Sequence, residues 1–500
     1  MFRRTCPRLL MPYPSTRKTG LFWRALEIMD RKVYRMRTPR RIILRPENRM
    51  EGPRRRPRDN IMLKSVIITI FAAAARRAIR REKPFIIAVT GSVGKSSAKE
   101  TIAAALGARE AGSSVRASLK NYNNEYGVPF TILNVQTPGR DPLKWLLVLW
   151  RTLWLGWGFG RIGATTLILE MGADHKGDLA WLVGIAPPSI SVITAVAPAH
   201  TEFFGTVDDV ANEKATLIRA LPADGLGVLN NDDSRVTAMR KECRTECAYF
   251  GTSEGSDVRI VDAQTLTETN ELGHIFPVGL VVSFAVLGKE YALELRGTVG
   301  RPQAYAAAAA LAVATKLDIP AAKALERLER DYHGIPGRTR IIKGIKGTYL
   351  IDDSYNAASA TAVISALRDL AGIPVGEGQR RIAAFGDMRE LGEYSDEAHR
   401  SVGHEAAALG IDELVTCGTL ARAIAAAAQE AGMSAERIHS FDTSAEGGLF
   451  LQGLIRQGDL ILVKGSQGSR MEKVVKELMA EPLQAPFLLV RMTKDWIHRP

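Results

Sequence analysis

The stretch Thr90-Gly91-Ser92-Val93-Gly94-Lys95-Ser96-Ser97 decides the fold predicted for this 500-residue chain. It follows the apolar run 85–89, which is typical of a buried strand, and precedes the helix-favouring run 98–106. The glycines let backbone N–H groups approach phosphate oxygens, and the positive end of the helix dipole lies beside them. The stretch therefore predicts a phosphate-binding loop in which Lys95 holds the outer phosphates and the Ser96 hydroxyl ligates Mg²⁺.

This loop is shorter than the usual pattern G-x-x-x-x-G-K-[ST], because Val89 stands where the first glycine would be. The alternative interpretation is a glycine turn whose lysine points to solvent, and the agreement of strand, turn and helix signals argues against it. We expect the whole loop to contact a nucleotide, through Gly91, Ser92, Val93, Gly94, Lys95, Ser96 and Ser97.

Positive charge is concentrated at the beginning of the chain. Residues 1–60 contain 18 Lys+Arg and five Asp+Glu, whereas the remaining residues contain equal numbers of each sign, so the net charge of +13 belongs to this segment. A basic segment of this kind can contact phospholipid headgroups or nucleic acid, or it is a solvated extension. We expect no specific nucleic-acid partner.

Cysteine usage indicates a reduced compartment. The four cysteines are scattered, and Cys243 and Cys247 lack a second pair of ligands at the spacing of a zinc site. We therefore predict a cytoplasmic protein.

Two apolar segments bear on membrane contact. The segment 61–75 is interrupted by Lys64 and falls short of the roughly 20 apolar residues needed to span a bilayer. The segment 145–157 contains four of the seven tryptophans, which suits either a membrane interface or packing against its own domain. Contact of residues 1–83 and 145–157 with the inner face of a membrane is therefore one of two interpretations.

Strands and helices alternate after residue 84, which predicts the α/β class. Apolar runs at 85–89, 166–169 and 189–196 indicate parallel strands, and Gly and Pro at 333–338 indicate a hinge. We expect a central P-loop-type ATPase domain with a parallel sheet, followed by a Rossmann-like C-terminal α/β domain. The predicted division is 1–83 for the basic tail and apolar helix, 84–334 for the ATP-binding domain and 335–500 for the C-terminal domain.

Polar residues follow several of the predicted strands, where ligands bind in open parallel sheets. Glu170 and His200 come after two strands of the central domain, and near a triphosphate they suit an Mg²⁺ site. Arg338 in the hinge can reach a γ-phosphate when the domains close. Lys214 lies on the helix predicted over 206–221, and on sequence alone it is interpreted as a surface lysine.

Ordered motifs along residues 84–500 resemble the Mur ligase family, most closely its MurF type, which adds D-alanyl-D-alanine to a UDP-muramoyl-tripeptide. The motifs that carry the resemblance are Thr90–Ser97, Asn121–Pro129, Glu170–His175, Pro198–Gly205, Asn230–Asp233, Pro336–Arg338, Ile351–Ala357, Gly386–Gly392 and Val463–Ser466. The resemblance implies a ligase of peptidoglycan precursors that uses ATP and Mg²⁺, with a muramoyl-peptide acceptor and D-Ala-D-Ala or a similar amine as its partners.

The resemblance also implies catalytic roles. Lys95 and Ser96 would hold the ATP phosphates and Mg²⁺, while Glu170 and His200 would bind a second Mg²⁺. Lys214 matches the family lysine that becomes carbamoylated and supports that metal. A substrate carboxylate would attack the γ-phosphate, and an amine would then displace phosphate from the acyl phosphate.

Nucleotide and substrate contacts follow from the same resemblance. Arg338 and Asp353 would contact the nucleotide, and Gln303 would replace the family asparagine that reads adenine. The expected substrate-binding residues are Asn123, Asn124, Asn356 and Lys464.

Departures from the family pattern leave three interpretations. The family continues Asn-Ala-Asn-Pro where this chain has Asn356-Ala357-Ala358-Ser359, and its usual N-terminal UDP-binding domain is not recognisable in residues 1–83. The first interpretation is a ligase of the MurF type. The others are a Mur-type ligase with a different or lipid-linked acceptor, and a nucleotide-binding homologue without catalysis.

Overall fold

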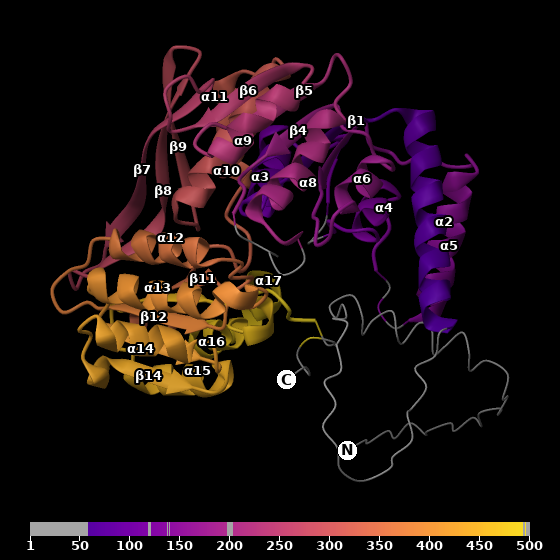
Figure 1. The fold of residues 1–500 in the computed structure, drawn as a ribbon. Coiled ribbons are helices and arrows are strands. Elements are labelled where there is room, and N and C mark those ends of the chain that lie inside the picture. Colours follow the sequence, from indigo (N-terminus) through magenta and orange to yellow (C-terminus); the bar gives the residue numbers. More distant parts are fainter. Residues whose placement is uncertain are drawn as a thin grey trace, which may run out of the picture.

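The computed structural model describes residues 59–118, 122–137, 139, 141–197, 204–493 and 496. Two α/β units, each built around one sheet, lie one above the other (Figure 1). The helix α2 (Asp59–Glu82) stands at the side of the first unit, next to α5 (Pro142–Gly156).

The first sheet has the order β2-β3-β1-β4-β5-β6-β7-β8-β9, and its pairings are parallel from β2 to β7 and antiparallel from β7 to β9. Its strands are β1 (Phe85–Thr90), β2 (Val115–Ala117), β3 (Thr166–Glu170), β4 (Ile190–Ile193), β5 (Leu226–Asn230), β6 (Glu246–Gly251), β7 (Val258–Thr269), β8 (Ile275–Val286) and β9 (Lys289–Arg296). Strand β1 lies inside the sheet, where the strand order reverses, and it leads directly into the glycine loop. In open α/β sheets, ligands bind at such a reversal.

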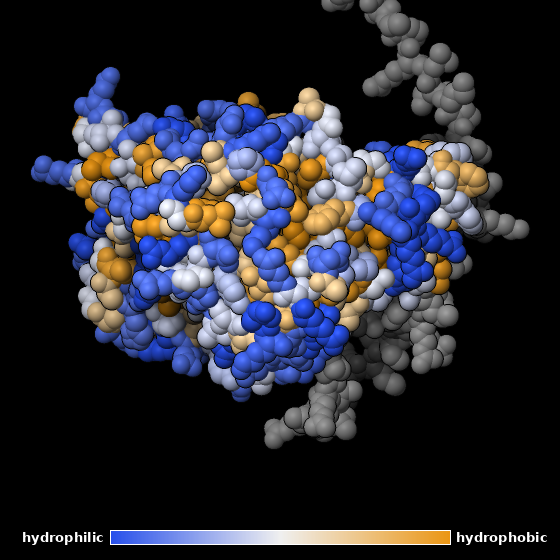
Figure 2. Space-filling view, turned by 90° about the horizontal axis from the view of Figure 1, so that it is seen from above, coloured by the Kyte–Doolittle hydropathy of each residue, from blue (hydrophilic) through white to orange (hydrophobic). Residues whose placement is uncertain are grey.

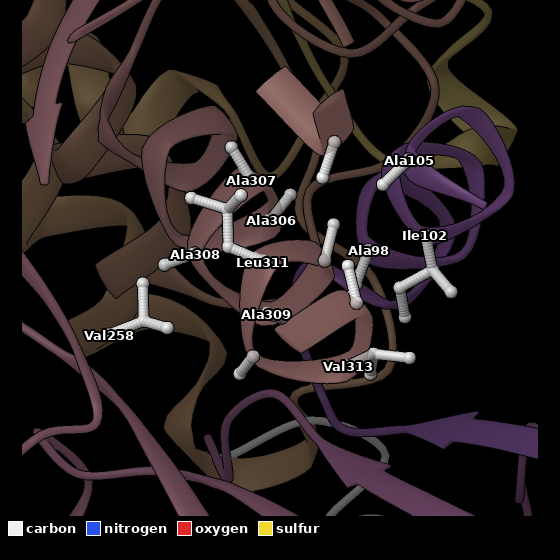
Figure 3. Close-up of a cluster of buried hydrophobic side chains, with 14 of the residues drawn as sticks. Ala98, Ile102, Ala105, Val258, Ala306, Ala307, Ala308, Ala309, Leu311 and Val313 are labelled. Carbon is white, nitrogen blue, oxygen red and sulfur yellow. The ribbon is translucent and has the colours of Figure 1, made fainter. Parts of the chain in front are cut away.

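The helices of the first unit cover both faces of this sheet. They are α3 (Lys95–Ala105), α4 (Gly127–Ile132), α6 (Asp178–Val183), α8 (Val207–Arg219), α9 (Ser234–Ala238), α10 (Arg301–Lys316) and α11 (Ala321–Asp331), besides α2 and α5. Alanines of α10 pack beside Ala98, Ile102 and Ala105 of α3 (Figure 3). Such small side chains allow two helices to approach closely, and this packing fixes the start of α3 against the start of α10.

The second sheet has the order β10-β11-β15-β12-β13-β14, and it is parallel except for β10. Its strands are β10 (Arg340–Lys343), β11 (Tyr349–Asp353), β12 (Arg381–Gly386), β13 (Glu413–Cys417), β14 (Ile438–Phe441) and β15 (Leu460–Lys464). The helices around it are α12 (Ala360–Ala371), α13 (Ser395–Ala408), α14 (Arg422–Glu430), α15 (Ser444–Leu454), α16 (Glu472–Leu478) and α17 (Ala485–Leu488). The predicted α/β class, with a P-loop sheet followed by a Rossmann-like sheet, is confirmed.

Helix α2 is part of the core of the first unit. Phe71 and Ala75 are fully buried, and the ring of Phe71 meets Phe130 edge to face with centroids 4.9 Å apart. The helix continues past Arg76, whose Nε donates to the carbonyl of Gly184 at 2.8 Å. No helix among the described residues is long and apolar enough to cross a membrane. The predicted domain boundaries at 84 and 335 stay predictions.

Candidate active site

A cleft of 2760 Å³ separates the two units and contains most of the predicted site residues. Its walls come from the glycine loop, the ends of β3, β4 and β5, the start of α10, and the ends of β11 and β15. Clefts with a few converging polar groups are the usual place for substrates. His200 lies outside the described residues, so its predicted place at the metal stays a prediction.

The glycine loop needs its glycines for two separate physical reasons. Gly91 has φ of +152°, and a Cβ atom there would lie 2.0 Å from Thr194 Oγ1. Gly94 has φ of +83° and caps the start of α3 in the left-handed region, which glycine adopts without strain. Thr194 Oγ1 donates to the carbonyl of Val93 at 2.5 Å, so the segment after β4 braces the loop.

Lys95 lies at the mouth of this loop. Its ammonium donates to the carbonyls of Gly91 at 2.6 Å and Ser92 at 3.3 Å. Burial lowers the pKa of Lys95, while the nearby Glu170 carboxylate opposes that shift. The side chain is thereby held against the backbone groups that cradle phosphate in loops of this type.

Glu170 is the centre of a hydrogen-bonded group beneath the loop. Ser96 Oγ and Asn123 Nδ2 each donate to Glu170 Oε1 at 3.1 Å, and Arg338 Nη2 donates to Ser96 Oγ at 3.3 Å. The other oxygen, Oε2, is buried and has no hydrogen-bond partner among the described residues. A buried carboxylate oxygen without a partner is costly, and a cation would satisfy it.

The donor set around Glu170 fits Mg²⁺ shared with a nucleotide. Among the described residues no three His, Cys, Asp or Glu side chains come close enough to form a metal site. Mg²⁺ is commonly held by one or two protein oxygens together with substrate phosphates and water. Ser96 Oγ and Glu170 Oε2 supply such oxygens next to the phosphate-binding loop.

Lys214 is buried, whereas the sequence alone predicted a surface lysine. It lies on α8, lines the cleft and is only 4% exposed. Burial, followed by the charge of Lys95, lowers the pKa of Lys214 to about 7, although Glu213 and Asp174 oppose the shift. An amine with this pKa is neutral in a large fraction of molecules near pH 7, so it can act as a nucleophile.

The second unit brings three predicted residues together. Lys464 Nζ donates to Asp353 Oδ2 at 2.5 Å and to the carbonyl of Asn356 at 3.0 Å. Arg338 extends from the hinge with its guanidinium 4.5 Å from the centre of the Tyr355 ring, which orients it toward Ser96. Residues far apart in sequence thus meet across the cleft.

Two further predicted residues, Asn124 and Gln303, also form hydrogen bonds within the protein. Asn124 Oδ1 accepts from the backbone N–H of Gly127 at 3.1 Å, at the start of α4. The amide nitrogen of Gln303 donates to Arg338 O at 3.2 Å and to Thr339 Oγ1 at 3.0 Å, and its oxygen accepts from Tyr332 at 2.6 Å. Gln303 therefore ties α10 to the hinge, and its predicted contact with adenine stays a prediction.

Sequence reasoning missed Tyr355 and Asp174. Tyr355 supports Arg338 through its ring face, and Asp174 lines the cleft close enough to act on the pKa values of both Lys95 and Lys214. Both residues belong to motifs that were recognised, Ile351–Ala357 and Glu170–His175. Position in a motif did not reveal what their side chains contact.

Comparison with known proteins places most of the residues that line the cleft within matched segments. The sequence model of the Mur ligase middle domain matches residues 89–314, and that of the Mur ligase, glutamate ligase domain, matches residues 337–467. The UDP-N-acetylmuramoyl-tripeptide–D-alanyl-D-alanine ligase of Escherichia coli K12 is 30% identical over 410 residues, which are 80% of this chain and 78% of the relative. The ligase of that name from Mycobacterium tuberculosis H37Rv is 31% identical over 415 residues, with coverage of 79% and 73%.

Solved structures share the fold. MurF from Acinetobacter baumannii superposes with a TM-score of 0.65 at 24% identity, covering 82% of this chain and 79% of that one. MurF from Thermotoga maritima in complex with ADP superposes with a TM-score of 0.64 at 24% identity, with coverage of 82% and 83%. At this identity, the superpositions show a common fold.

Proposed function

Because this chain belongs to the Mur ligase family, we propose that it is an ATP-dependent, ADP-forming ligase that joins D-alanyl-D-alanine to a muramoyl peptide during peptidoglycan precursor synthesis. The observation that carries the proposal is the hydrogen-bonded group of Ser96, Glu170 and Arg338 next to the phosphate loop. A cation ligand, a phosphate loop and an oriented guanidinium are parts that phosphoryl transfer uses.

The first step transfers the γ-phosphoryl group to a carboxylate. Backbone N–H groups of the loop and Lys95 bind the phosphates, while Arg338 supports the group in transfer from the hinge side. Mg²⁺, held by Ser96 and Glu170, would neutralise the repulsion between the carboxylate and the phosphates when it is bound. An oxygen of the substrate carboxylate forms a bond to the γ-phosphorus, the bond to ADP breaks, and an acyl phosphate results.

The second step forms the amide. The amine of the incoming dipeptide attacks the acyl carbon, the tetrahedral intermediate expels inorganic phosphate, and the amine loses its proton. Water would destroy the acyl phosphate, so the two units must enclose it. The Asp353–Lys464 pair and Asn356 are on the wall from which the second unit would close.

Lys214 has the chemistry required for carbamoylation. The ammonium first loses a proton, and the neutral amine can then add to the carbon of CO₂ and release a second proton, which leaves an anionic carbamate. The pKa of about 7 makes this reaction available near neutral pH. We infer that a carbamate on Lys214 would add negative charge to the cleft near Lys95 and Asp174, whose charges already act on this lysine.

A second candidate concerns the acceptor. Ala358 and Ser359 line the cleft at positions where the family pattern has Asn-Pro, and this observation favours a different or lipid-linked acceptor. The non-catalytic alternative is disfavoured because Lys95, Glu170 and Lys214 are all present in the cleft. Catalysis in the cytoplasm fits the need for ATP, and contact with the membrane surface stays a prediction.

Measurement of phosphate release with a panel of substrates tests the proposal. The purified chain should release phosphate from ATP only when an acceptor carboxylate and an amine are both present. Fast release with UDP-muramoyl-tripeptide and D-Ala-D-Ala supports the first candidate, while release with lipid-linked acceptors alone supports the second. Absence of turnover with every pair, despite ATP binding, would contradict catalysis.

A further inference from the structure

Helix α5 exposes large apolar side chains along one stripe. Its solvent face, continued one residue beyond the helix, consists of Leu143, Leu146, Leu147, Trp150, Leu153, Trp154 and Trp157, which we call the α5 stripe. Trp150 is 60% exposed and Trp157 63%. Their spacing of three, four and seven residues places the whole set on one side of the helix.

The opposite face of α5 already packs on the protein. Trp145 and Leu155 are buried, and Gly156 approaches Ala74 of α2. Arg81 of α2 fastens the end of α5 by donating to the carbonyl of Leu155 at 2.9 Å. Because the helix is fixed in this way, the stripe belongs to a rigid surface of the first unit. Single exposed apolar residues are common, but a continuous row of this length indicates an interaction surface.

The charges around the stripe are almost all positive. Lys144 and Arg151 flank it on α5, and Arg77 and Arg80 are exposed on α2. Asp141 is the one acidic residue in the segment 141–161, and its carboxylate caps the start of α5 by accepting from Leu143 N. Figure 2 shows hydrophobic side chains beside strongly hydrophilic ones at the edge of the molecule where α2 and α5 lie.

The basic end of the chain precedes helix α2 directly in the sequence. Residues 1–58 contain 18 Lys+Arg and four Asp+Glu, and they join the chain at Asp59, the first residue of α2. Anionic lipid headgroups attract such segments, and each basic side chain near the surface adds to binding. A second copy of this chain would instead bring a like charge against the stripe, which opposes association.

We propose that the α5 stripe binds the surface of an anionic bilayer, with α5 lying in the plane of the interface and the basic residues around it contacting the headgroups. Tryptophan and leucine enter the boundary between headgroups and acyl chains, where amphipathic rings are stable. The binding is peripheral, since no helix among the described residues is long and apolar enough to span. It would place the cleft next to the membrane, and it does not depend on the proposed reaction.

Vesicle sedimentation with the full-length chain tests this inference. Vesicles of phosphatidylcholine with about one-third phosphatidylglycerol should bind the chain, blue-shift its tryptophan emission and release much of it at high salt. The double variant Trp150→Glu/Trp157→Glu should lower the partition coefficient at least about tenfold, because two inserted apolar side chains become charged. The matched control is Leu272→Glu/Leu483→Glu, which places the same charges at exposed apolar sites outside the stripe and should lower it much less.

Three results would overturn the inference. The first is absence of binding by the full-length chain. The second is equal loss of binding in the stripe variant and in its control, which would assign the binding to net charge alone. The third is a dimer in sedimentation velocity that the stripe variant dissociates, without vesicle binding by the parent, because the stripe would then be an interface between two copies. The far-UV circular dichroism spectrum and the midpoint of urea unfolding serve as the folding control, and both variants should match the parent in them.

Discussion

Replacement of Lys214 by methionine should raise stability and remove catalysis. The folded state lowers the pKa of this lysine from 10.5 to about 7 through burial. The unfolded chain therefore binds more protons between these values, and stability of the wild type rises with pH across this window. The difference between the two pKa values, at about 1.4 kcal/mol for each pH unit, sets an upper limit of about 5 kcal/mol on the free-energy cost of burying the charged lysine.

Methionine removes this cost with an apolar side chain of similar length. Glu213 and Asp174 lose a nearby cation in the variant, so we expect a net gain in the free energy of unfolding of about 2–4 kcal/mol at pH 7. The gain should shrink as the pH rises and vanish near pH 10.5. Phosphate release should fall by at least about 100-fold, because methionine cannot carry the carbamate whose negative charge would balance Mg²⁺.

Urea unfolding in CO₂-free buffer at pH 7 and at pH 9.5, together with phosphate release, measures both effects. Lys323→Met, at an exposed lysine of α11, is the matched control and should change neither quantity much. A Lys214→Met variant that is less stable than the parent at pH 7, or that retains full turnover, would refute the reasoning.

Three further predictions concern the loop and the hinge. Gly91→Ala should lower the free energy of unfolding, measured by urea titration, by about 2–4 kcal/mol, because the added Cβ would clash with Thr194 Oγ1. Gly453→Ala is the control and should not lower it, because a Cβ at that position meets no other atom. Equal stability of both variants would contradict the loop geometry. Lys95→Ala should cut phosphate release at least about 100-fold, and retained activity would exclude the phosphate-loop assignment. Burial raises the pKa of Asp352 to about 6, so the wild type loses stability as the pH rises through 6. Asp352→Asn should therefore raise the free energy of unfolding by about 1–3 kcal/mol at pH 8 and by little at pH 4. A gain at pH 4 alone would contradict the predicted pH dependence.

Local signals in the sequence were sufficient for the loop and the order of the elements. A strand, a glycine turn and a helix follow one another within 85–106, and short-range periodicity predicts them. The strand predicted over 189–196 proved too long, since β4 ends at Ile193 and the following residues leave the sheet to brace the loop. That departure depends on a contact with Val93, about 100 residues earlier, which periodicity cannot show.

Local sequence patterns could not predict the roles of residues whose contacts lie far along the chain. Gln303 was predicted to read adenine, but its partners lie 29–36 residues further along the chain. Helical spacing alone predicted Lys214 as a surface lysine, because it does not reveal which neighbour covers a face, and only the family resemblance indicated a function for it. Likewise, helix α2 continues through its arginines because Arg76 and Arg81 find backbone carbonyls on neighbouring elements.

Transfer of oxygen from the acceptor to phosphate tests the central claim most directly. An acceptor labelled with ¹⁸O in its reacting carboxylate should yield inorganic phosphate that carries one labelled oxygen for each amide formed, as mass spectrometry of the phosphate would show. This result is expected because the carboxylate oxygen bonds to the γ-phosphorus and leaves with it. Unlabelled phosphate accompanying amide formation would contradict an acyl phosphate intermediate in this cleft.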